Sequence, residues 1–327
     1  MPEGHSVHRI ARQFDRNFVG HRVHVSSPQG RFADGAAMID GATVTEVWAV
    51  GKQMFMAFDQ GSWLRVHLGM YGAWDFAGDI QMDPTIASAN GRMGQTTQRG
   101  TVFDDAGENS ISSIGAPRKT RVRMAEAEKE SALAAVGSTF PPEPIGQVRV
   151  RLLTDSVCAD LRGPTVCEVL TREDVDQVLD RLGPDPQRDS SDEAGHKFVS
   201  AIRKKNTSIG QILMDQAVVA GIGNVYRAEM LFRAGIDPYR PGKSITEDEA
   251  WALWRDWIHL LAIGVETGQM MTIDGLEGES WRKAMAHRDD RHWVYKREGL
   301  PCRNCGTHIA LDMMATRKLY WCPTCQT

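Results

Sequence analysis

Short runs of apolar residues dominate the beginning and middle of the chain and predict β-strands there. A helix over Ser6–Phe18 is predicted first, because its apolar residues recur at helical spacing. The strand-like runs are Arg22–Ser26, Thr43–Val50, Gln53–Phe58, Trp63–Leu68, Gln147–Leu153 and Ser156–Leu161. Gly51 and Lys52 separate two of these runs, and the turn at residues 59–61 leads into the next, so a meander or sandwich of strands is expected.

A stretch from about residue 78 to 140 breaks this pattern. It is rich in Gly, Ser, Thr, Gln and Ala and has few large apolar residues. We therefore predict a surface insertion that is partly disordered and carries one helix around Val122–Val136.

The residue pattern of the second half of the chain predicts helices. Its pattern predicts helices over Lys197–Lys204, Ser208–Ala217 and Asn224–Ala234, and a longer helix marked by Trp251, Trp254 and Trp257. The helical spacing of these tryptophans favours a core position over a base-stacking surface. Gly183 and the acidic run that follows predict a linker. The predicted domains are 1–182, a linker 183–195, a helical domain 196–287 and a C-terminal ribbon 288–327.

Composition and charge narrow the class of protein. With 42% hydrophobic and 24% charged residues, the composition is typical of a soluble globular protein. There is no run of about 18 apolar residues and no apolar signal segment, so we expect a cytoplasmic protein without a membrane span. The net charge of −4 is unusual for a nucleic-acid-binding protein, but basic residues crowd 197–205 and 282–303, and the local field is what a ligand meets.

The six cysteines fall into two groups. Cys158 and Cys167 are isolated and are expected to be buried apolar residues. The other four form two C-x-x-C pairs separated by sixteen residues, the spacing of a four-thiolate zinc ribbon: Cys302, Cys305, Cys322 and Cys325. A disulfide framework is the alternative, which a long non-secreted chain disfavours. Four thiolates fill the tetrahedral shell of zinc, so one structural Zn²⁺ is predicted.

Pro2 and Glu3 carry candidate chemistry at the chain start. Removal of Met1 would leave Pro2 with a secondary amine that can attack an electrophilic carbon and form an iminium ion. Glu3 would supply the neighbouring proton donor and acceptor. Taken alone, this dipeptide is far more often an ordinary solvated terminus.

Five motifs, taken together in their order along the chain, favour a catalytic role for Pro2 and Glu3 over a solvated terminus. They are the Pro2-Glu3 start, Gly51-Lys52 after a strand, the segment 67–72 (HLGMYG), the segment 214–229 (MDQ…GIGNVYRAE) and the four-cysteine ribbon. In this order they resemble the formamidopyrimidine-DNA glycosylase/endonuclease VIII family, over nearly the whole chain outside the insertion. The opening PEGH and the segments SSPQGRFADG and DLRGPTVCE are most similar to the endonuclease VIII-like branch.

The resemblance implies a fold, an activity and partners. The expected fold is α+β: an N-terminal β-sandwich with flanking helices, then a helical domain with a helix–two-turn–helix element and a zinc ribbon. The expected protein is a monomeric, nucleoid-associated base-excision-repair enzyme that acts on damaged double-stranded DNA. It would be a DNA glycosylase and an abasic-site lyase at once.

The family's catalytic roles map onto the chain start. Pro2 would attack C1′ of the damaged nucleotide and expel the base. Glu3 would protonate the sugar ring oxygen and relay protons, and β- and δ-elimination would then cut the strand. Lys52, on a tight turn between two strands, matches the family's lysine that reaches the DNA backbone. An exposed turn lysine without a role is the alternative.

Three residues of the first domain match DNA contacts of the family. His67 matches a phosphate contact, although a lone histidine is as often structural. Met70 and Tyr71 match the wedge that fills the gap left by the flipped base. The alternative is that both pack in the sheet.

Three residues of the second half match further family positions. Asn224 opens a helix after two glycines, a place where backbone N–H groups bind phosphate, and it can also be an N-cap. Glu229 matches a family glutamate near the active site, with pairing to a basic neighbour as the alternative. Arg317 matches the ribbon's phosphate-binding arginine, with a solvated cation as the alternative.

The chain departs from the family at one catalytic position. A further glutamate of many relatives is replaced here by Ser6, with His5 before it. The PEGH start favours oxidised pyrimidines as substrates, whereas Met70 resembles the wedge of the 8-oxoguanine branch. A DNA-binding protein without catalysis and an RNA-binding zinc-ribbon protein remain as alternative functions.

Overall fold

The computed structural model describes residues 2–81, 113–115 and 140–327, which form two compact units. The N-terminal unit contains the described residues up to 179 and also 266–268. The C-terminal unit contains residues 180–265 and 269–327.

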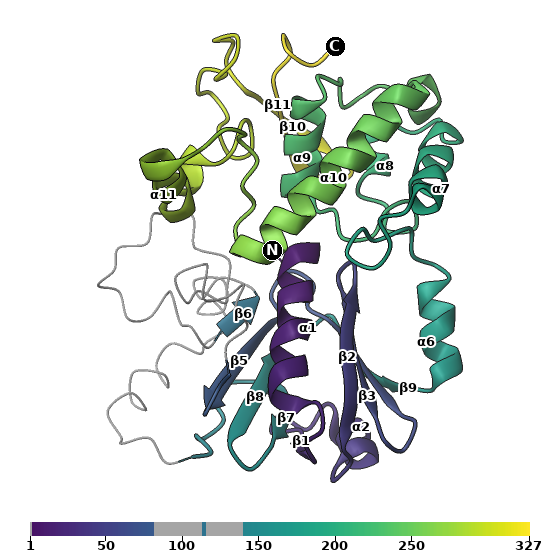
Figure 1. Cartoon of the computed structure of the whole chain (residues 1–327), viewed down its shortest axis with the longest axis vertical. Coiled ribbons are helices and arrows are strands. Elements are labelled where there is room, and N and C mark those ends of the chain that lie inside the picture. Colours follow the sequence, from purple (N-terminus) through teal and green to yellow (C-terminus); the bar gives the residue numbers. More distant parts are fainter. Residues whose placement is uncertain (1, 82–112, 116–139) are drawn as a thin grey trace. The chain divides into compact units, whose positions relative to one another are not determined.

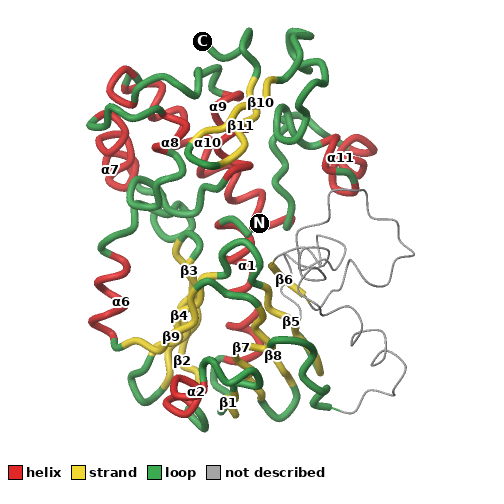
Figure 2. Tube along the Cα trace, turned by 180° about the vertical axis from the view of Figure 1, so that it is seen from behind, coloured by secondary structure: helices red, strands yellow, loops and turns green. Residues whose placement is uncertain are grey.

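Two antiparallel sheets build the N-terminal unit (Figures 1 and 2). The four-stranded sheet has the order β2 (Val44–Val50), β3 (Gln53–Phe58), β4 (Trp63–His67) and β9 (Val166–Leu170). The five-stranded sheet has the order β1 (His24–Ser26), β7 (Val148–Leu153), β8 (Val157–Arg162), β5 (Ala73–Gly78) and β6 (Ser113–Gly115).

Helix α1 (Gly4–Phe18) joins the two sheets in one core. Its apolar residues Val7, Ile10, Phe14 and Phe18 are buried together with inward-facing residues of both sheets. The Phe14 ring meets the Trp74 ring edge-on at 4.7 Å between centroids, a favoured aromatic geometry. A sandwich with a packed helix results, which confirms the predicted fold class. Two shorter helices, α2 (Ala33–Ile39) and α6 (Arg172–Leu179), complete the unit.

Several elements of this unit were not predicted. Strand β9 has no fully buried residue, so it lacks the alternation that marks a strand with one buried face. Strands β5 and β6 pair with each other, so part of the stretch interpreted as an insertion belongs to the sheet. The predicted helix over Val122–Val136 lies outside the described residues.

Helices build most of the C-terminal unit. Their buried residues form one core in which Trp254 and Trp257 are at most 1% exposed, which confirms the core position for these two, whereas Trp251 is only partly buried against the core. The ring of Trp254 lies tilted against that of Phe198, and Trp257 meets Tyr226 edge-on. The helices are α7 (Asp192–Arg203), α8 (Ile209–Ile212), α9 (Asn224–Arg233), the 3₁₀ turn η1 (Gly242–Ser244), α10 (Glu247–Thr267), α11 (Gly278–Ala286) and the 3₁₀ turn η2 (Arg288–Asp290).

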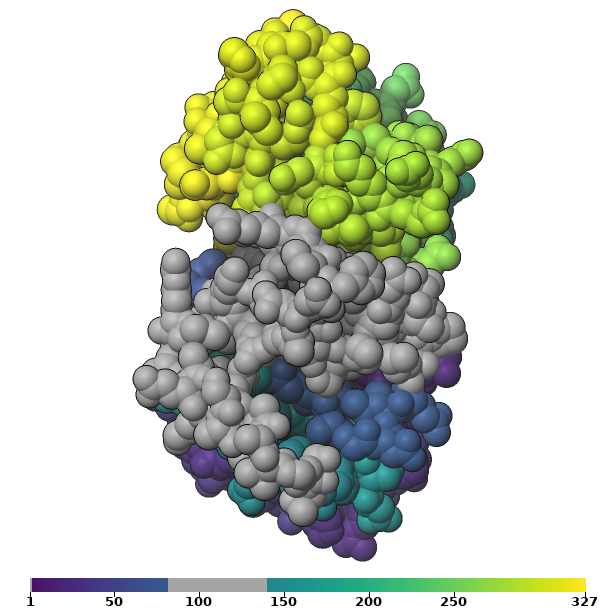
Figure 3. All heavy atoms as spheres, turned by 90° about the vertical axis from the view of Figure 1, so that its left-hand side faces the viewer, coloured from purple at the N-terminus to yellow at the C-terminus, as the bar shows by residue number. Residues whose placement is uncertain are grey.

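A two-stranded ribbon of β10 (Ala310–Met314) and β11 (Arg317–Trp321) follows the helices. Figure 2 shows this ribbon beside α9, and Figure 3 shows its atoms (yellow) lying against those of the helical part (green). Phe232 of α9 shares a small apolar cluster with Ile309 and Tyr320 of the ribbon. No helix of the described residues is long and apolar enough to cross a membrane.

Two predicted boundaries in this unit were wrong. The predicted linker extends too far, because Asp192 and Glu193 at the end of its acidic run form the first turn of α7. Ser191 caps this helix by accepting from the Ala194 backbone N–H at 3.3 Å. The helix expected to reach Ala217 ends at Ile212, because Asp215 closes a turn by accepting from the Ala217 N–H at 3.0 Å.

Candidate active site and metal centre

Pro2 and Glu3 lie at the start of α1 and are buried. Glu3 is the N-cap residue in an extended conformation, and its carbonyl accepts from the Ser6 N–H at 3.0 Å. Its carboxylate does not cap the helix. Pro2 therefore lies beside the N-terminal, positive end of the helix dipole.

His5 and Ser6, where the chain departs from the family, contact each other. The Ser6 hydroxyl lies 3.2 Å from Nε2 of His5, and both residues are buried. Burial, with Arg9 as the next contributor, lowers the pKa of His5 to about 3. His5 is therefore neutral and orients the serine hydroxyl as a hydrogen-bonding partner without adding charge.

Lys52 and His67 are brought together by strand pairing. Gly51 and Lys52 form a two-residue hairpin loop between β2 and β3, with Gly51 at φ +57°. Gln53, the next residue, pairs with His67 across the sheet. Burial, followed by the charges of Lys52 and Arg65, lowers the pKa of His67.

The neutral form of His67 has a defined proton position. The Gly69 backbone N–H lies 3.1 Å from Nδ1 of His67 and donates to it. Nδ1 is then the acceptor, so the geometry assigns the ring proton to Nε2. Beside Lys52, this arrangement offers a cation and a neutral N–H donor, a pair suited to phosphate.

The loop after His67 projects two large apolar side chains. Met70 is 47% exposed and Tyr71 is 45% exposed. Gly69 has φ +63°, and a side chain there would collide with the Thr165 hydroxyl, so this tight loop requires glycine. The alternative that Met70 and Tyr71 pack in the sheet is wrong.

Asn224 lies at the first turn of α9, where it binds the ribbon. Its side-chain amide donates to the Lys318 carbonyl of β11 at 2.9 Å. Its carbonyl oxygen accepts from Arg227, which also donates to the Lys318 carbonyl at 3.0 Å. The N-cap residue is Gly223, so the interpretation of Asn224 as an N-cap was wrong.

Glu229 is fully buried and holds a backbone segment. Its two carboxylate oxygens accept from the backbone N–H groups of Trp293 (2.7 Å), Val294 (2.9 Å) and Tyr295 (2.7 Å) and from the Thr272 hydroxyl. Burial raises the pKa of Glu229, and these hydrogen bonds oppose the rise. Pairing with a basic neighbour, the alternative given above, is not what is found. With 0% exposure the residue has no surface with which to contact DNA directly.

The four ribbon cysteines form a site that fits zinc. Their sulfur atoms all lie within 4.8 Å of one another, with Cys302 3.8 Å from Cys325 and Cys305 3.5 Å from Cys322. Zn–S bonds of about 2.3 Å in a tetrahedron require sulfur separations of about 3.8 Å. The cluster thus suits one structural Zn²⁺.

Arg317 follows the turn of the ribbon. The turn residues Ala315 and Thr316 have φ of +48° and +64°, an uncommon conformation for residues other than glycine. Met314 pairs with Arg317 across the turn, and Arg317 is half-buried at the start of β11.

Sequence reasoning missed the residues that fix this unit. Arg227 joins α9 to β11, and Thr272 with residues 293–295 surrounds Glu229. The sequence did contain one indication, because Arg227 and Glu229 are charged residues in the middle of a largely apolar helix. Buried charges of this kind need partners, although the sequence does not name them.

Comparison with known proteins gives matches along most of the chain. Sequence models match for the formamidopyrimidine-DNA glycosylase N-terminal domain (residues 1–131), the formamidopyrimidine-DNA glycosylase H2TH domain (182–274) and the zinc finger found in FPG and IleRS (299–327). Endonuclease 8 1 of Mycobacterium tuberculosis is 37% identical over the full length of both chains. Formamidopyrimidine-DNA glycosylase of Thermus thermophilus is 38% identical over 46% of this chain and 55% of its own.

Solved structures show the same fold. The crystal structure of MutM (Fpg) from Thermus thermophilus matches 99% of this chain and 98% of its own, with a TM-score of 0.63 and 25% identity. The Lactococcus lactis formamidopyrimidine-DNA glycosylase bound to DNA with an abasic site matches 99% of both chains, with a TM-score of 0.69 and 18% identity. Given the full-length relative, the three domain matches and the four-cysteine cluster, the chain belongs to the formamidopyrimidine-DNA glycosylase/endonuclease VIII family of base-excision-repair DNA glycosylases.

Proposed function

We propose that the protein is a bifunctional DNA glycosylase and abasic-site lyase that removes oxidised bases, oxidised pyrimidines above all, through a Schiff base on Pro2. The observation that carries the proposal is Pro2-Glu3 at the start of α1, with both residues buried beside the positive end of the helix. The full-length similarity to Endonuclease 8 1 proteins supports the same reading.

The proposed reaction begins with the Pro2 nitrogen. An α-amino group has a pKa of about 8, so a useful fraction is unprotonated at neutral pH, and the helix N-terminus increases that fraction. The nitrogen bonds to C1′ while the glycosidic bond breaks and the base leaves. Glu3 protonates the sugar ring oxygen, the ring opens, and an iminium ion forms.

Strand cleavage follows from the iminium ion. The positive charge acidifies the proton at C2′, and its removal expels the 3′ phosphate in β-elimination. A second elimination expels the 5′ phosphate. Hydrolysis then releases the unsaturated sugar and restores the free amine of Pro2.

The remaining site residues are proposed to hold and distort the DNA. Lys52 and the neutral His67 would bind phosphate through an ammonium and an Nε2–H donor. Met70 would enter the gap left by the flipped nucleotide, since an exposed apolar side chain on a rigid loop suits a wedge. In the C-terminal unit, the N-terminus of α9 at Asn224 would contact phosphate through backbone N–H groups, and the ribbon would present Arg317.

Borohydride trapping on a duplex with an abasic site tests the nucleophile. Reduction of the Schiff base should give a covalent adduct with the processed protein and none with Pro2→Ala or with Met1 retained. Pro28→Ala, a proline in a loop of the same unit, is the matched control and should trap normally. Mass spectrometry that places the crosslink on a lysine would refute the role of Pro2.

Excision from a panel of duplexes tests the lesion preference. The proposal expects faster removal of oxidised pyrimidines than of 8-oxoguanine or ring-opened purines. The reverse order would place the protein functionally with its formamidopyrimidine-DNA glycosylase relatives. If the protein binds DNA but excises no base, it is a non-catalytic DNA-binding protein. If it binds undamaged RNA as tightly as duplex DNA, an RNA-binding role is favoured.

A further inference from the structure

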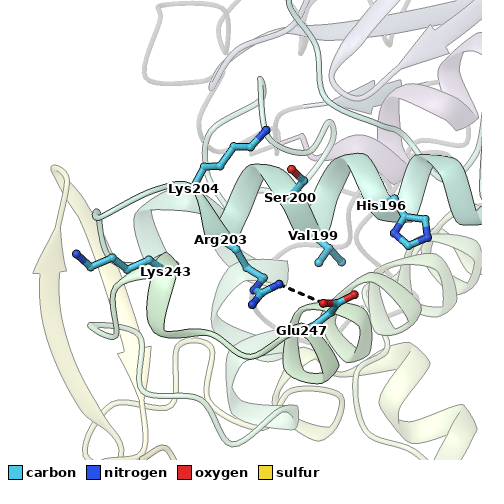
Figure 4. A pocket seen from close by; sticks show the side chains of 7 residues that line it. All are labelled: His196, Val199, Ser200, Arg203, Lys204, Lys243 and Glu247. Atoms are coloured by element: carbon cyan, nitrogen blue, oxygen red, sulfur yellow. Dashed lines mark hydrogen bonds and ion pairs between the residues drawn. The ribbon is translucent and has the colours of Figure 1, made fainter.

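A hollow of about 390 Å³ opens in the C-terminal unit between α7 and the start of α10 (Figure 4). None of the site residues discussed above lines it. Its polar lining consists of His196, Ser200, Arg203 and Lys204 of α7 and its end, Lys243 of η1 and Glu247 of α10. We call this hollow the α7 groove.

Backbone hydrogen bonds make the α7 groove a fixed feature. The Lys243 N–H donates to the Lys205 carbonyl at 2.9 Å, and the Gly242 N–H donates to the Thr207 carbonyl at 2.9 Å. A side chain at Gly242 would collide with the Ile202 carbonyl, so glycine is needed for this close approach. The connector that follows α7 is thereby locked against η1, and Lys204 and Lys243 stay on the same side of the unit.

The two lysines carry uncompensated positive charge. Neighbouring cations are neutralised: Arg203 pairs with Glu247 at 3.2 Å, and Lys205 pairs with Asp215 at 3.2 Å. Lys204 and Lys243 are exposed and have no acidic partner among the residues that the structure describes. In a chain of net charge −4, this is a local positive field that a polyanion would meet.

The directions of the side chains indicate the kind of anion. Figure 4 shows the ammonium groups of Lys204 and Lys243 extending away from each other, while Arg203 turns toward Glu247. Two diverging cations do not enclose a single small anion. They suit a nucleic-acid backbone, because each lysine can contact a different phosphate along it.

The connector that follows Lys204 contacts the ribbon. Ser208, in the connector after Lys204, places its hydroxyl 3.7 Å from the Met314 sulfur at the turn of the ribbon. A side chain at Gly210 would also meet that sulfur. The ribbon turn leads directly to Arg317, so these contacts join the connector after Lys204 to the turn that precedes Arg317.

We propose that Lys204 and Lys243 bind the DNA backbone beyond the phosphates proposed for Arg317 and the N-terminus of α9, and so lengthen the DNA footprint of the C-terminal unit. This inference rests on the proposed DNA glycosylase function. Counterions released from the additional phosphates would then contribute to affinity. An acidic protein segment is the competing occupant, and the experiment below separates the two.

The test compares the double variant Lys204→Ala/Lys243→Ala with the wild-type protein on two duplexes that carry the same abasic-site analogue. The short duplex ends close to the lesion, and the long one adds roughly ten base pairs on each side, or about 34 Å. On the long duplex the slope of log affinity against log salt should fall by about 1.8, and affinity should fall about tenfold. On the short duplex, affinity should be unchanged, and so should single-turnover excision from a duplex of the same short length that carries a damaged base instead of the analogue.

The matched control is Lys197→Ala/Lys283→Ala, which removes the same charge from lysines that already pair with Glu193 and Asp290. If the control variant loses as much affinity for the long duplex, the effect comes from net charge alone, and the proposal is wrong. Salt slopes equal to those of the wild type on both duplexes would also overturn the proposal. Binding of oligoglutamate, which mimics an acidic protein segment, is measured in parallel. If the double variant loses only oligoglutamate binding, the groove binds an acidic protein segment and not DNA. Failure of the wild-type protein to bind either duplex would instead refute the proposed function.

Discussion

The two units use their polar and wedge residues in opposite ways. In the N-terminal unit, Lys52 lies on a hairpin turn and Met70 and Tyr71 project from a loop, so side chains themselves face a ligand. In the C-terminal unit, Asn224 is 9% exposed and Glu229 is 0% exposed, and their side chains bind backbone of the same unit. Asn224 and Glu229 thus hold the C-terminal unit together, and the ligand contacts proposed for that unit are made by other side chains, such as Arg317.

A small core explains this difference. The ribbon shares only a short apolar cluster with α9, so burial alone stabilises it weakly. Zinc thiolates, the Asn224–Lys318 hydrogen bond and the Glu229 hydrogen bonds supply the remaining order. The N-terminal unit has a continuous core of both sheets and α1, which leaves its loop residues available for contact.

Removal of zinc should have the largest effect. Chelation, or Cys322→Ser, removes a site whose binding free energy is on the order of 10 kcal/mol in small zinc domains. The ribbon should lose amide-exchange protection and DNA affinity, while protection of the N-terminal sheets persists. Cys167→Ser, a thiol of the N-terminal unit, is the control and should keep its zinc. A ribbon that stays protected without metal would show that the hydrogen bonds suffice.

The substitution Glu3→Gln should have the second-largest effect. The substitution keeps the shape of the side chain and removes the acid, so base excision should slow by about 10² to 10⁴-fold, or about 3 to 5 kcal/mol in activation free energy. Thermal unfolding should change little. Glu46→Gln on β2 is exposed and serves as the control. Excision at the wild-type rate would place the proton donor elsewhere.

Glu229→Gln should destabilise the C-terminal unit by about 2 to 3 kcal/mol. An amide has one acceptor oxygen, whereas three backbone N–H groups and one hydroxyl now converge on two. Denaturant unfolding followed by tryptophan fluorescence measures the loss, with exposed Glu298→Gln as the control. If both variants unfold alike, the buried carboxylate does not hold the 293–295 segment.

The pH dependence of that difference has a defined sign. The folded-state pKa of Glu229 is raised, so the folded protein binds the proton more tightly than the unfolded chain. The resulting stability is fully present below the unfolded pKa of about 4.5 and is lost as pH rises through the folded pKa. The stability of wild type relative to Glu229→Gln should therefore fall over this window. A rise would show that the backbone N–H groups outweigh burial.

Met70→Ala should have the smallest effect. An exposed wedge contributes to the distorted DNA complex and little to folding, so excision should slow about tenfold, or about 1.4 kcal/mol, without a change in Tm. Met38→Ala, on α2 and 58% exposed, is the matched control. Equal activity of the two variants would remove the wedge role from Met70.

Local patterns in the sequence predicted much of the molecule. Strand runs separated by Gly51-Lys52, the Trp254 and Trp257 core and the two C-x-x-C pairs were all recognised, and the structure confirms each of them. These features depend on spacing within a few residues or on a fixed ligand geometry. The family resemblance, also drawn from the sequence, is confirmed by the full-length relative.

Contacts between distant residues were decided only by the tertiary structure. Glu229 meets residues 293–295, and Asn224 meets Lys318, across 64 or more positions of chain. The exposure of Met70 depends on the close approach of Gly69 to Thr165, and strand β9 became recognisable only through its pairing with β4. Hydrogen bonds and steric contacts form between groups that are close in space. The sequence therefore shows which polar groups need partners, but only the folded backbone determines which partners they meet.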